Sequence, residues 1–226
     1  MLFLAVFCGF LAENIREHLI EKERERQYIV SMVDDVTRDT VQVSDAYNNS
    51  IQRLAGFDSL LNSVHETPYS DSTLKLLYYL NRKYILSRTG FPFTKRTISQ
   101  LKNAGGLRLI RNQAASDSII LYDQACERIE SQMEITIVPT ILDHVAPLAY
   151  KIFDMHYLYQ FSKIRDFKNS AIQLHLLNND EKLITEYVNW VYHARGYLTR
   201  YTLLLKEHMQ RSSRLISLLK KSYHLE

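Results

Sequence analysis

Apolar residues recur at alternating steps of four and three along two long stretches of the chain. In the first stretch, all but a threonine and a serine in the series are apolar: Ile29, Val33, Val36, Thr40, Val43, Tyr47, Ser50, Leu54, Phe57, Leu61 and Val64. A seven-residue repeat of this kind is typical of helices that pack at a shallow angle, as in bundles and coiled coils. The pattern predicts one helix of about fifty residues that begins near Glu13 and ends near Ser63.

The last part of the chain repeats the pattern after a cluster of helix-capping residues at positions 178–180. The series is Ile184, Tyr187, Val191, Ala194, Leu198, Tyr201, Leu205, His208, Ser212, Leu215, Leu219 and Ser222. A flanking apolar row that includes Trp190 and Tyr197 widens this face, so we expect the helix to contact more than one neighbour. Because the two terminal helices match in length and period, we predict an all-α, elongated helical bundle in which they pack antiparallel with shorter helices between them.

The first half of the middle region predicts short helices separated by turns. Apolar spacing indicates a helix over residues 73–86. Thr97 opens a capping-box pattern for another short helix, and Gly105 has the position of a C-terminal cap. Asn112 is placed to cap the helix that follows.

The second half of the middle region continues the helical pattern up to the long C-terminal helix. We expect Pro139 to end or kink the helix that begins after Asn112. Two further helices are predicted over residues 141–159 and 167–177. The chain has only 6 Gly and 4 Pro and contains no internal repeat or linker, so residues 13–226 are predicted to form a single domain.

Residues 1–12 (MLFLAVFCGFLA) contain no charged and no strongly polar side chain. As a helix they are roughly 18 Å long, too short for the hydrocarbon core of a bilayer, which is about 30 Å thick. The sequence turns polar at Glu13 without a helix stop, which favours a truncated transmembrane helix that continues into a charged stalk over residues 13–28. The alternatives are a truncated or atypical signal sequence, although the basic start of such a sequence is lacking, and the buried start of a helix.

The chain lacks the residue patterns of common catalytic and metal sites. Two cysteines, Cys8 and Cys126, are too few for a disulfide framework or a cysteine-based zinc cluster. None of the 8 histidines follows an acidic residue by three positions, as the sites of di-iron bundles require. His208 is expected to be partly buried and hydrogen-bonded, and Cys126 to be inert packing. We therefore expect no catalytic residue, no metal and no cofactor, and a protein that is not an enzyme.

The middle of the chain has a strong excess of basic residues. No acidic residue lies between Ser72 and Ser116, whereas the whole chain has a net charge of only +3. Five of the basic residues there are candidates for binding an anionic partner: Arg88, Lys95, Arg96, Arg108 and Arg111. The alternative is that they form ion pairs with Asp34, Asp35, Asp39, Glu127, Glu130 or other acidic residues of the long helices.

Two parts of the sequence resemble a family of uncharacterised bacterial membrane-anchored proteins, known only as a domain of unknown function. One part comprises residues 9–14 (GFLAEN), 25–29 (ERQYI) and 33–36 (VDDV), and the other is residues 97–112 (TISQLKNAGGLRLIRN). The resemblance implies one N-terminal transmembrane helix, a charged stalk and a helical domain. A basic segment and further apolar residues precede the junction in that family, which implies a domain on the extracytoplasmic side by the positive-inside rule.

These observations together predict a membrane-anchored, non-enzymatic interaction or scaffold module in the bacterial inner membrane, with its domain on the periplasmic side. The expected partners are the membrane, through the N-terminal helix, and a protein or an anionic glycan; homo-oligomers are left open and no nucleic acid is expected. Two alternatives are an extracytoplasmic ligand-sensing bundle with a tyrosine-lined pocket and a soluble polyanion-binding protein. No specific role follows from the sequence.

Overall fold

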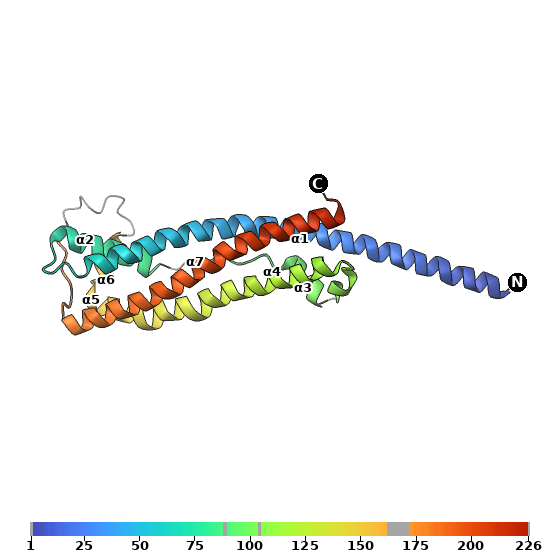
Figure 1. Cartoon of the computed structure of the whole chain (residues 1–226). Helices are drawn as coiled ribbons and strands as arrows, with labels where there is room; N and C mark the ends of the chain where they lie inside the picture. The colour runs from blue at the N-terminus through green and yellow to red at the C-terminus, as the bar shows by residue number, and fades with distance from the viewer. Residues whose placement is uncertain (1, 88–89, 104, 162–171, 226) are drawn as a thin grey trace. The chain divides into compact units, whose positions relative to one another are not determined.

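The structure is a computed structural model that describes residues 2–87, 90–103, 105–161 and 172–225. Within these ranges the secondary structure is helical, and the only extended pairing is an isolated bridge between Phe153 and Leu176. Two long helices, α1 (Leu2–Ser63) and α7 (Glu181–Tyr223), lie at the two ends of the sequence (Figure 1). The prediction of an all-α fold with two long terminal helices and shorter helices between them is confirmed.

The two seven-residue series form the buried faces of the long helices. In the first series eight positions are buried, seven on α1 and Val64 directly after its end, and the exceptions are Thr40, Tyr47 and Leu54, which are partly exposed. On α7 every position from Tyr187 to Leu219 is buried. The predicted capping cluster starts α7, because the Asp180 carboxylate accepts a hydrogen bond from the Leu183 N–H at 2.9 Å.

The packing of α1 against α7 is antiparallel, as predicted. Ser50 of α1 accepts a hydrogen bond from the Thr202 hydroxyl at 3.0 Å, whereas Asp58, further along α1, is bound by the earlier α7 residue Arg195 at 2.5 and 3.0 Å. The contacts within the chain group it into two compact units. The predicted division into residues 1–12 and one domain of residues 13–226 is a different partition, and it stays a prediction.

The first unit comprises Met1–Val43, Pro92–Cys126 and Glu207–Glu226. It contains the first part of α1, α3 (Arg96–Asn103), the 3-10 turn η2 (Gly106–Leu109), most of α4 (Gln113–Ser131) and the end of α7. Its core consists of apolar side chains from all of these helices, among them Ile29, Val36, Leu101, Ile119 and Leu219. The predicted caps are present: Gly105 has φ = +64°, and the Asn112 side chain accepts a hydrogen bond from the Ala115 N–H at 3.1 Å.

The second unit comprises Ser44–Phe91 and Glu127–Lys206. Its short elements are α2 (Asp71–Leu80), α5 (Ala146–Ile152), α6 (Met155–Phe161) and three π-helical segments, η1 (Asn81–Ile85), η3 (Gln132–Ile137) and η4 (Thr140–Val145). The core is aromatic: Phe153 packs edge-on against Tyr78 and Tyr187, with ring centroids 5.2 and 5.9 Å apart. The buried Tyr187 hydroxyl accepts a hydrogen bond from the Asn81 side chain at 2.8 Å.

Pro139 does not end the helix that contains it, which was one of its two predicted effects; a kink there stays a prediction. Residues 113–152 form one uninterrupted helical run, in which Pro139 lies between the π-helical segments η3 and η4. The Val138 N–H bonds the carbonyl of Met133, five residues earlier, so the backbone turn beside the proline is wider than in an α-helix. Such wide turns let the chain absorb a residue that lacks an N–H group and whose ring crowds the preceding turn.

The helix predicted over residues 167–177 is not found where the structure describes that range. Residues 162–171 lie outside the described residues, and residues 172–177 are not helical. Here the Leu177 N–H donates a hydrogen bond to the Ile152 carbonyl at 2.9 Å, and the His175 carbonyl accepts one from the Tyr78 hydroxyl at 2.8 Å. Two backbone groups of this segment are therefore paired with α5 and α2 and do not form helical hydrogen bonds.

Candidate functional site

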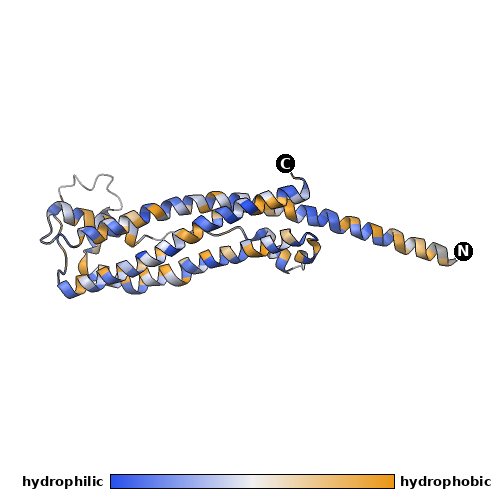
Figure 2. Ribbon diagram, in the orientation of Figure 1, coloured by the Kyte–Doolittle hydropathy of each residue, from blue (hydrophilic) through white to orange (hydrophobic). Residues whose placement is uncertain are grey.

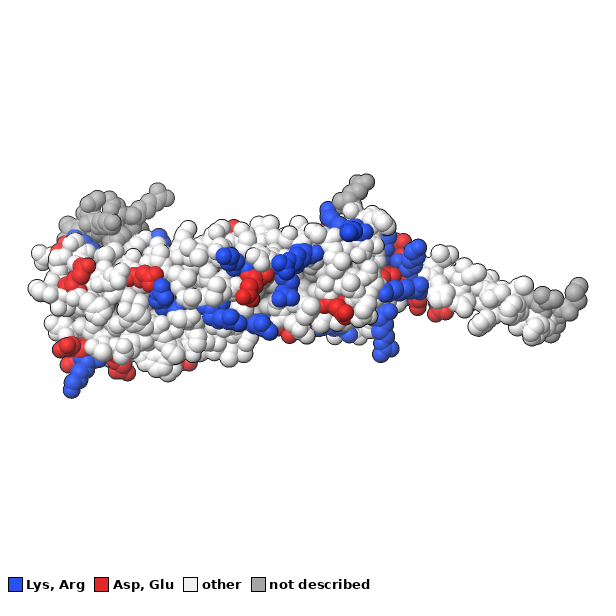
Figure 3. Space-filling model, in the orientation of Figure 1, with Lys and Arg blue, Asp and Glu red and all other residues white. Residues whose placement is uncertain are grey.

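The start of α1 presents an apolar surface that nothing else in the described chain covers. Every described side chain from residue 3 to residue 20 is exposed, including Phe3 at 81%, Val6 at 68% and Phe10 at 68% of its area. In Figure 3 this end of α1 carries no charged side chain until the acidic and basic residues that follow. Figure 2 shows the corresponding change along α1, from orange and pale residues near the N-terminus to mostly blue ones.

The helix expected to run from the apolar start into the charged stretch is confirmed, because α1 is continuous from Leu2 to Ser63. The alternative of a buried helix start is not what the structure shows, since the described side chains among residues 3–12 are all exposed. Within the described part of the chain, no helix is both long enough and apolar enough to cross a membrane. Membrane attachment by residues 1–12 therefore stays a prediction.

Contact between α1 and the rest of the first unit begins inside the predicted stalk. Glu25 is buried, and its carboxylate accepts hydrogen bonds from the Arg111 N–H at 2.8 Å and from the Tyr223 hydroxyl at 2.5 Å. Burial and the neighbouring Glu25 carboxylate both raise the pKa of Tyr223. The last part of the stretch 13–28 is thus fastened to the bundle, and only the earlier part is solvated on all sides.

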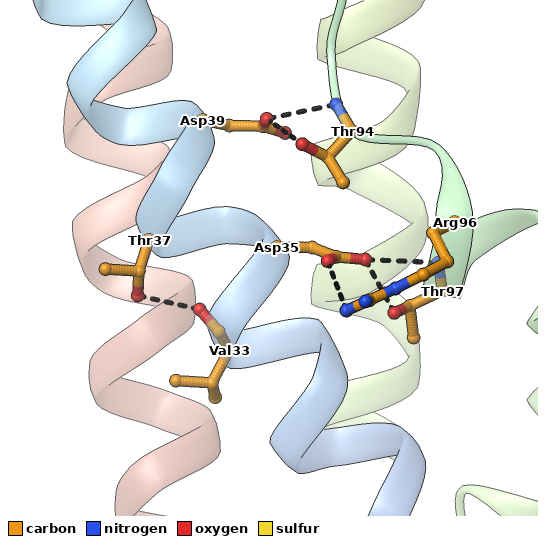
Figure 4. A network of polar contacts seen from close by, with 7 residues as sticks. All are labelled: Val33, Asp35, Thr37, Asp39, Thr94, Arg96 and Thr97. Carbon is orange, nitrogen blue, oxygen red and sulfur yellow. Dashed lines mark hydrogen bonds and ion pairs between the residues drawn. The ribbon is translucent and has the colours of Figure 1, made fainter.

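Two buried carboxylates of α1 hold the segment that leads into α3 (Figure 4). Asp35, only 2% exposed, accepts hydrogen bonds from the N–H and the hydroxyl of Thr97, at 3.1 and 2.6 Å, and pairs with Arg96 at 2.8 Å. Asp39, one turn later and fully buried, accepts hydrogen bonds from the N–H and the hydroxyl of Thr94 at 3.0 and 2.7 Å. It also accepts a hydrogen bond from the Tyr122 hydroxyl at 2.8 Å. Thr97 therefore bonds to α1 and does not close the capping box that its own helix was expected to contain.

The five basic candidates lie in different environments. Arg88 falls outside the described residues, and Lys95 is exposed next to Arg96 at the start of α3. Arg108 is exposed, and its side chain forms no ion pair or hydrogen bond with any described residue. Arg111 is exposed but pairs with Glu21 at 2.9 Å and contacts the His18 ring at 3.1 Å.

The described candidates form two groups at opposite ends of α3 rather than one cluster. Arg96 and Arg111 both pair with carboxylates of α1, which is the arrangement expected if the charge asymmetry serves folding. Lys102, a further basic residue of the region, pairs with Asp123 of α4. The exposed pair of Arg111 with Glu21 contributes little free energy and leaves that guanidinium accessible to a stronger partner, whereas Arg96 is bound to the buried carboxylate of Asp35. Partner binding by these residues stays a prediction.

His208 is more deeply buried than expected and lacks a partner on one ring nitrogen. It is only 1% exposed, and its Nδ1 forms no hydrogen bond with any described residue. Its Nε2 lies 3.7 Å from the Cys126 sulfur, and its ring packs against Phe93 and Tyr122 with centroids 5.1 and 4.8 Å away. Burial, with a smaller contribution from the charge of Arg211, lowers the pKa of His208 to about 4. The ring is therefore neutral at physiological pH.

The buried residue Arg53 was not singled out by the sequence, because it lies between positions of the apolar series. Its guanidinium donates hydrogen bonds to the carbonyls of Tyr84 at 2.7 Å, Ile85 at 3.2 Å and Ser87 at 2.9 Å, at the end of η1. Burial lowers the pKa of Arg53 to about 10, so it stays charged at neutral pH. Arg53 thus satisfies carbonyl groups that the end of a helix leaves without partners.

Comparisons of the chain with protein-family models, with curated proteins and with solved structures find no match. The resemblance to the membrane-anchored family stays a prediction. Among the described residues, no group of three or more His, Cys, Asp or Glu side chains is arranged to hold a metal ion. His144, which follows Asp143 in the sequence, stacks on Trp190 with ring centroids 3.8 Å apart.

Proposed function

We propose that this chain is a membrane-anchored, non-enzymatic helical module that holds an interaction surface at a membrane. Residues 1–12 of α1 enter the apolar part of the bilayer, and the charged stretch after Glu13 carries the helix out into water. The observation that supports this proposal most strongly is the exposed, uncharged start of α1, which continues without a break into a helix fastened to the bundle at Glu25.

The apolar area at the start of α1 is large enough for measurable binding. Among the described side chains before the first charge, five large apolar ones are exposed: Phe3, Val6, Phe7, Phe10 and Leu11. Each is worth roughly 2 kcal/mol when fully transferred from water, so partial burial of all five contributes on the order of 6 kcal/mol. This is comparable with a single acyl chain, which gives reversible membrane binding.

The role of the anchored module is interaction or scaffolding on the extracytoplasmic side of a bacterial inner membrane. The placement outside the cytoplasm rests on the resemblance to the membrane-anchored family, and the partner expected there is a protein or an anionic glycan. Two features support a role for this end of α3 in binding an anion. The exposed guanidinium of Arg108 has no partner among the described residues, and Arg111 forms only an exposed, exchangeable pair with Glu21.

Flotation with phosphatidylcholine vesicles tests the anchor. We expect the chain to float with the vesicles, and we expect Phe7→Glu/Phe10→Glu to abolish flotation because each introduces a charge into the hydrocarbon region. The matched control is Val41→Glu/Leu203→Glu, which places two charges at apolar positions of similar exposure, 62% and 49%, outside the start of α1. A chain that stays in the aqueous fraction, or equal loss for both double variants, would refute the proposed anchor.

A further inference from the structure

We propose that a groove between α4 and α7 in the first unit binds an organic anion with an apolar body, such as a medium-chain carboxylate. The groove has a volume of about 480 Å³, within the range of small-molecule sites. Ser118 and Leu121 of α4 form one wall, and Arg211, Arg214, Leu215 and Leu218 of α7 lie along the other. This inference does not depend on the proposed anchor.

The two helices run antiparallel here and are closed against each other at one end of the groove. Cys126 and Tyr122 of α4 contact the ring of His208 on α7, and these three buried side chains fill the space between the helices. Beyond this contact the lining residues of α7 fall three, four and seven positions apart, so they share one face of the helix. The groove is therefore a built feature of two regular helices and contains no loop.

The charge of the groove favours an anion. Arg211 and Arg214 lie about one turn apart, and neither side chain forms an ion pair or a hydrogen bond with any described residue. By contrast, Arg96, Arg111 and Arg195 are all paired with carboxylates. Guanidinium groups bind carboxylate and phosphate through two parallel hydrogen bonds, which makes an unpaired pair of arginines well suited to such a group.

The remaining lining explains why the ligand needs an apolar body. Leu121, which lines the groove together with Leu218, is 51% exposed, so a hydrocarbon chain would bury area that now faces water. Glu207 also lines the groove and offsets one of the two positive charges. A ligand with one negative charge matches the net charge better than a polyanion does, and the hydroxyl of Ser118 and the amide of Gln210 supply further polar contacts.

Calorimetric titration of the full chain with decanoate, below its micelle concentration, tests the site. The same titrations with decanol and with inorganic phosphate separate the contributions of the charge and of the hydrocarbon chain. We expect decanoate to bind at least about ten-fold more tightly than either, because charge-assisted hydrogen bonds and apolar burial each contribute. Titration of the Phe7→Glu/Phe10→Glu chain shows whether the start of α1 adds a second site.

The variants assign binding to this groove. Arg211→Gln/Arg214→Gln is expected to weaken decanoate binding by about ten-fold or more, whereas the control pair Arg24→Gln/Arg38→Gln, at exposed arginines outside the groove, leaves it unchanged. Leu121→Asn tests the other wall and is expected to weaken binding several-fold. Equal binding of decanol and decanoate, or of inorganic phosphate and decanoate, overturns the proposal. Unchanged affinity in a folded Arg211→Gln/Arg214→Gln variant overturns it as well. If the arginine double variant does not fold, unchanged affinity in Leu121→Asn overturns the proposal instead.

Discussion

Acid should destabilise this protein through His208, and the effect can be calculated from the surroundings of that side chain. The folded protein holds His208 neutral, because its ring is buried and its Nδ1 has no acceptor among the described residues. The groups that face it are Tyr122 and Cys126 from α4, Phe93 from the segment before α3, and the cation of Arg211 one turn later on α7. None of these offers a negative charge to a protonated imidazole.

The lowered pKa sets both the direction and the size of the effect. The pKa of His208 is about 4 in the folded protein, against about 6.5 in an unfolded chain. Between these two values the unfolded chain binds a proton that the folded protein does not, so the free energy of unfolding falls as the pH is lowered. The loss amounts to about 1.4 kcal/mol per pH unit and about 3 kcal/mol in all, and above pH 6.5 this histidine contributes no pH dependence.

Urea unfolding, followed by circular dichroism at several pH values between 7 and 4, measures this slope. His208→Met places an apolar side chain of similar length at the site and removes the titrating group. The change in the free energy of unfolding per pH unit should therefore decrease by about 1.4 kcal/mol, which corresponds to one proton. His144→Gln, at an exposed ring, serves as the control and should keep the slope of the natural chain. The reasoning fails if His208→Met unfolds with the same pH dependence as the natural chain.

Three substitutions test the packing of the bundle. Gly56→Ala should lower the free energy of unfolding, measured with urea, by about 1–3 kcal/mol, because an added Cβ would overlap a tyrosine ring of η1. The control Gly196→Ala, with open space around it, should be neutral or slightly stabilising. Asp35→Ala should lower the free energy of unfolding by about 2–4 kcal/mol, since it leaves buried donors of α3 unpaired. Asp34 is exposed on the same helix, so Asp34→Ala should lower it little, and equal losses for the two variants would contradict this role of Asp35. Leu198→Ala should cost about 2–5 kcal/mol by thermal or urea unfolding, and a loss below about 1 kcal/mol would mean that this position is not core.

The long helices could be predicted because their apolar period persists over many turns. A register sustained from Ile29 to Val64 outweighs the occasional polar residue, and the cap at Asp180 marks the start of α7 without ambiguity. The behaviour of Pro139 could not be predicted in this way. Its effect depends on whether the flanking turns widen to a π-helix, and composition gives no signal for that choice.

The candidate site was predictable only in part, because charge counts carry no information on pairing. The sequence shows an excess of basic residues, and it names Asp35 and Asp39 as carboxylates that could pair with them. Their spacing of four residues places both on one face of α1, yet only the fold brings Thr94 and Thr97 to them. No pattern in the sequence indicates the groove beside Arg211, because the groove depends on how far apart α4 and α7 lie.

Entry of the start of α1 into a bilayer is the central claim, and Cys8 provides a direct measurement. Cys8 is exposed within the apolar segment, whereas Cys126 is buried, so an environment-sensitive fluorophore on the native chain should label Cys8 selectively, with Cys8→Ser as the control. We predict that phosphatidylcholine vesicles shift the emission to shorter wavelength and protect the fluorophore from iodide quenching. Unchanged emission and full quenching in the presence of vesicles would show that residues 1–12 stay in water, and would contradict the account.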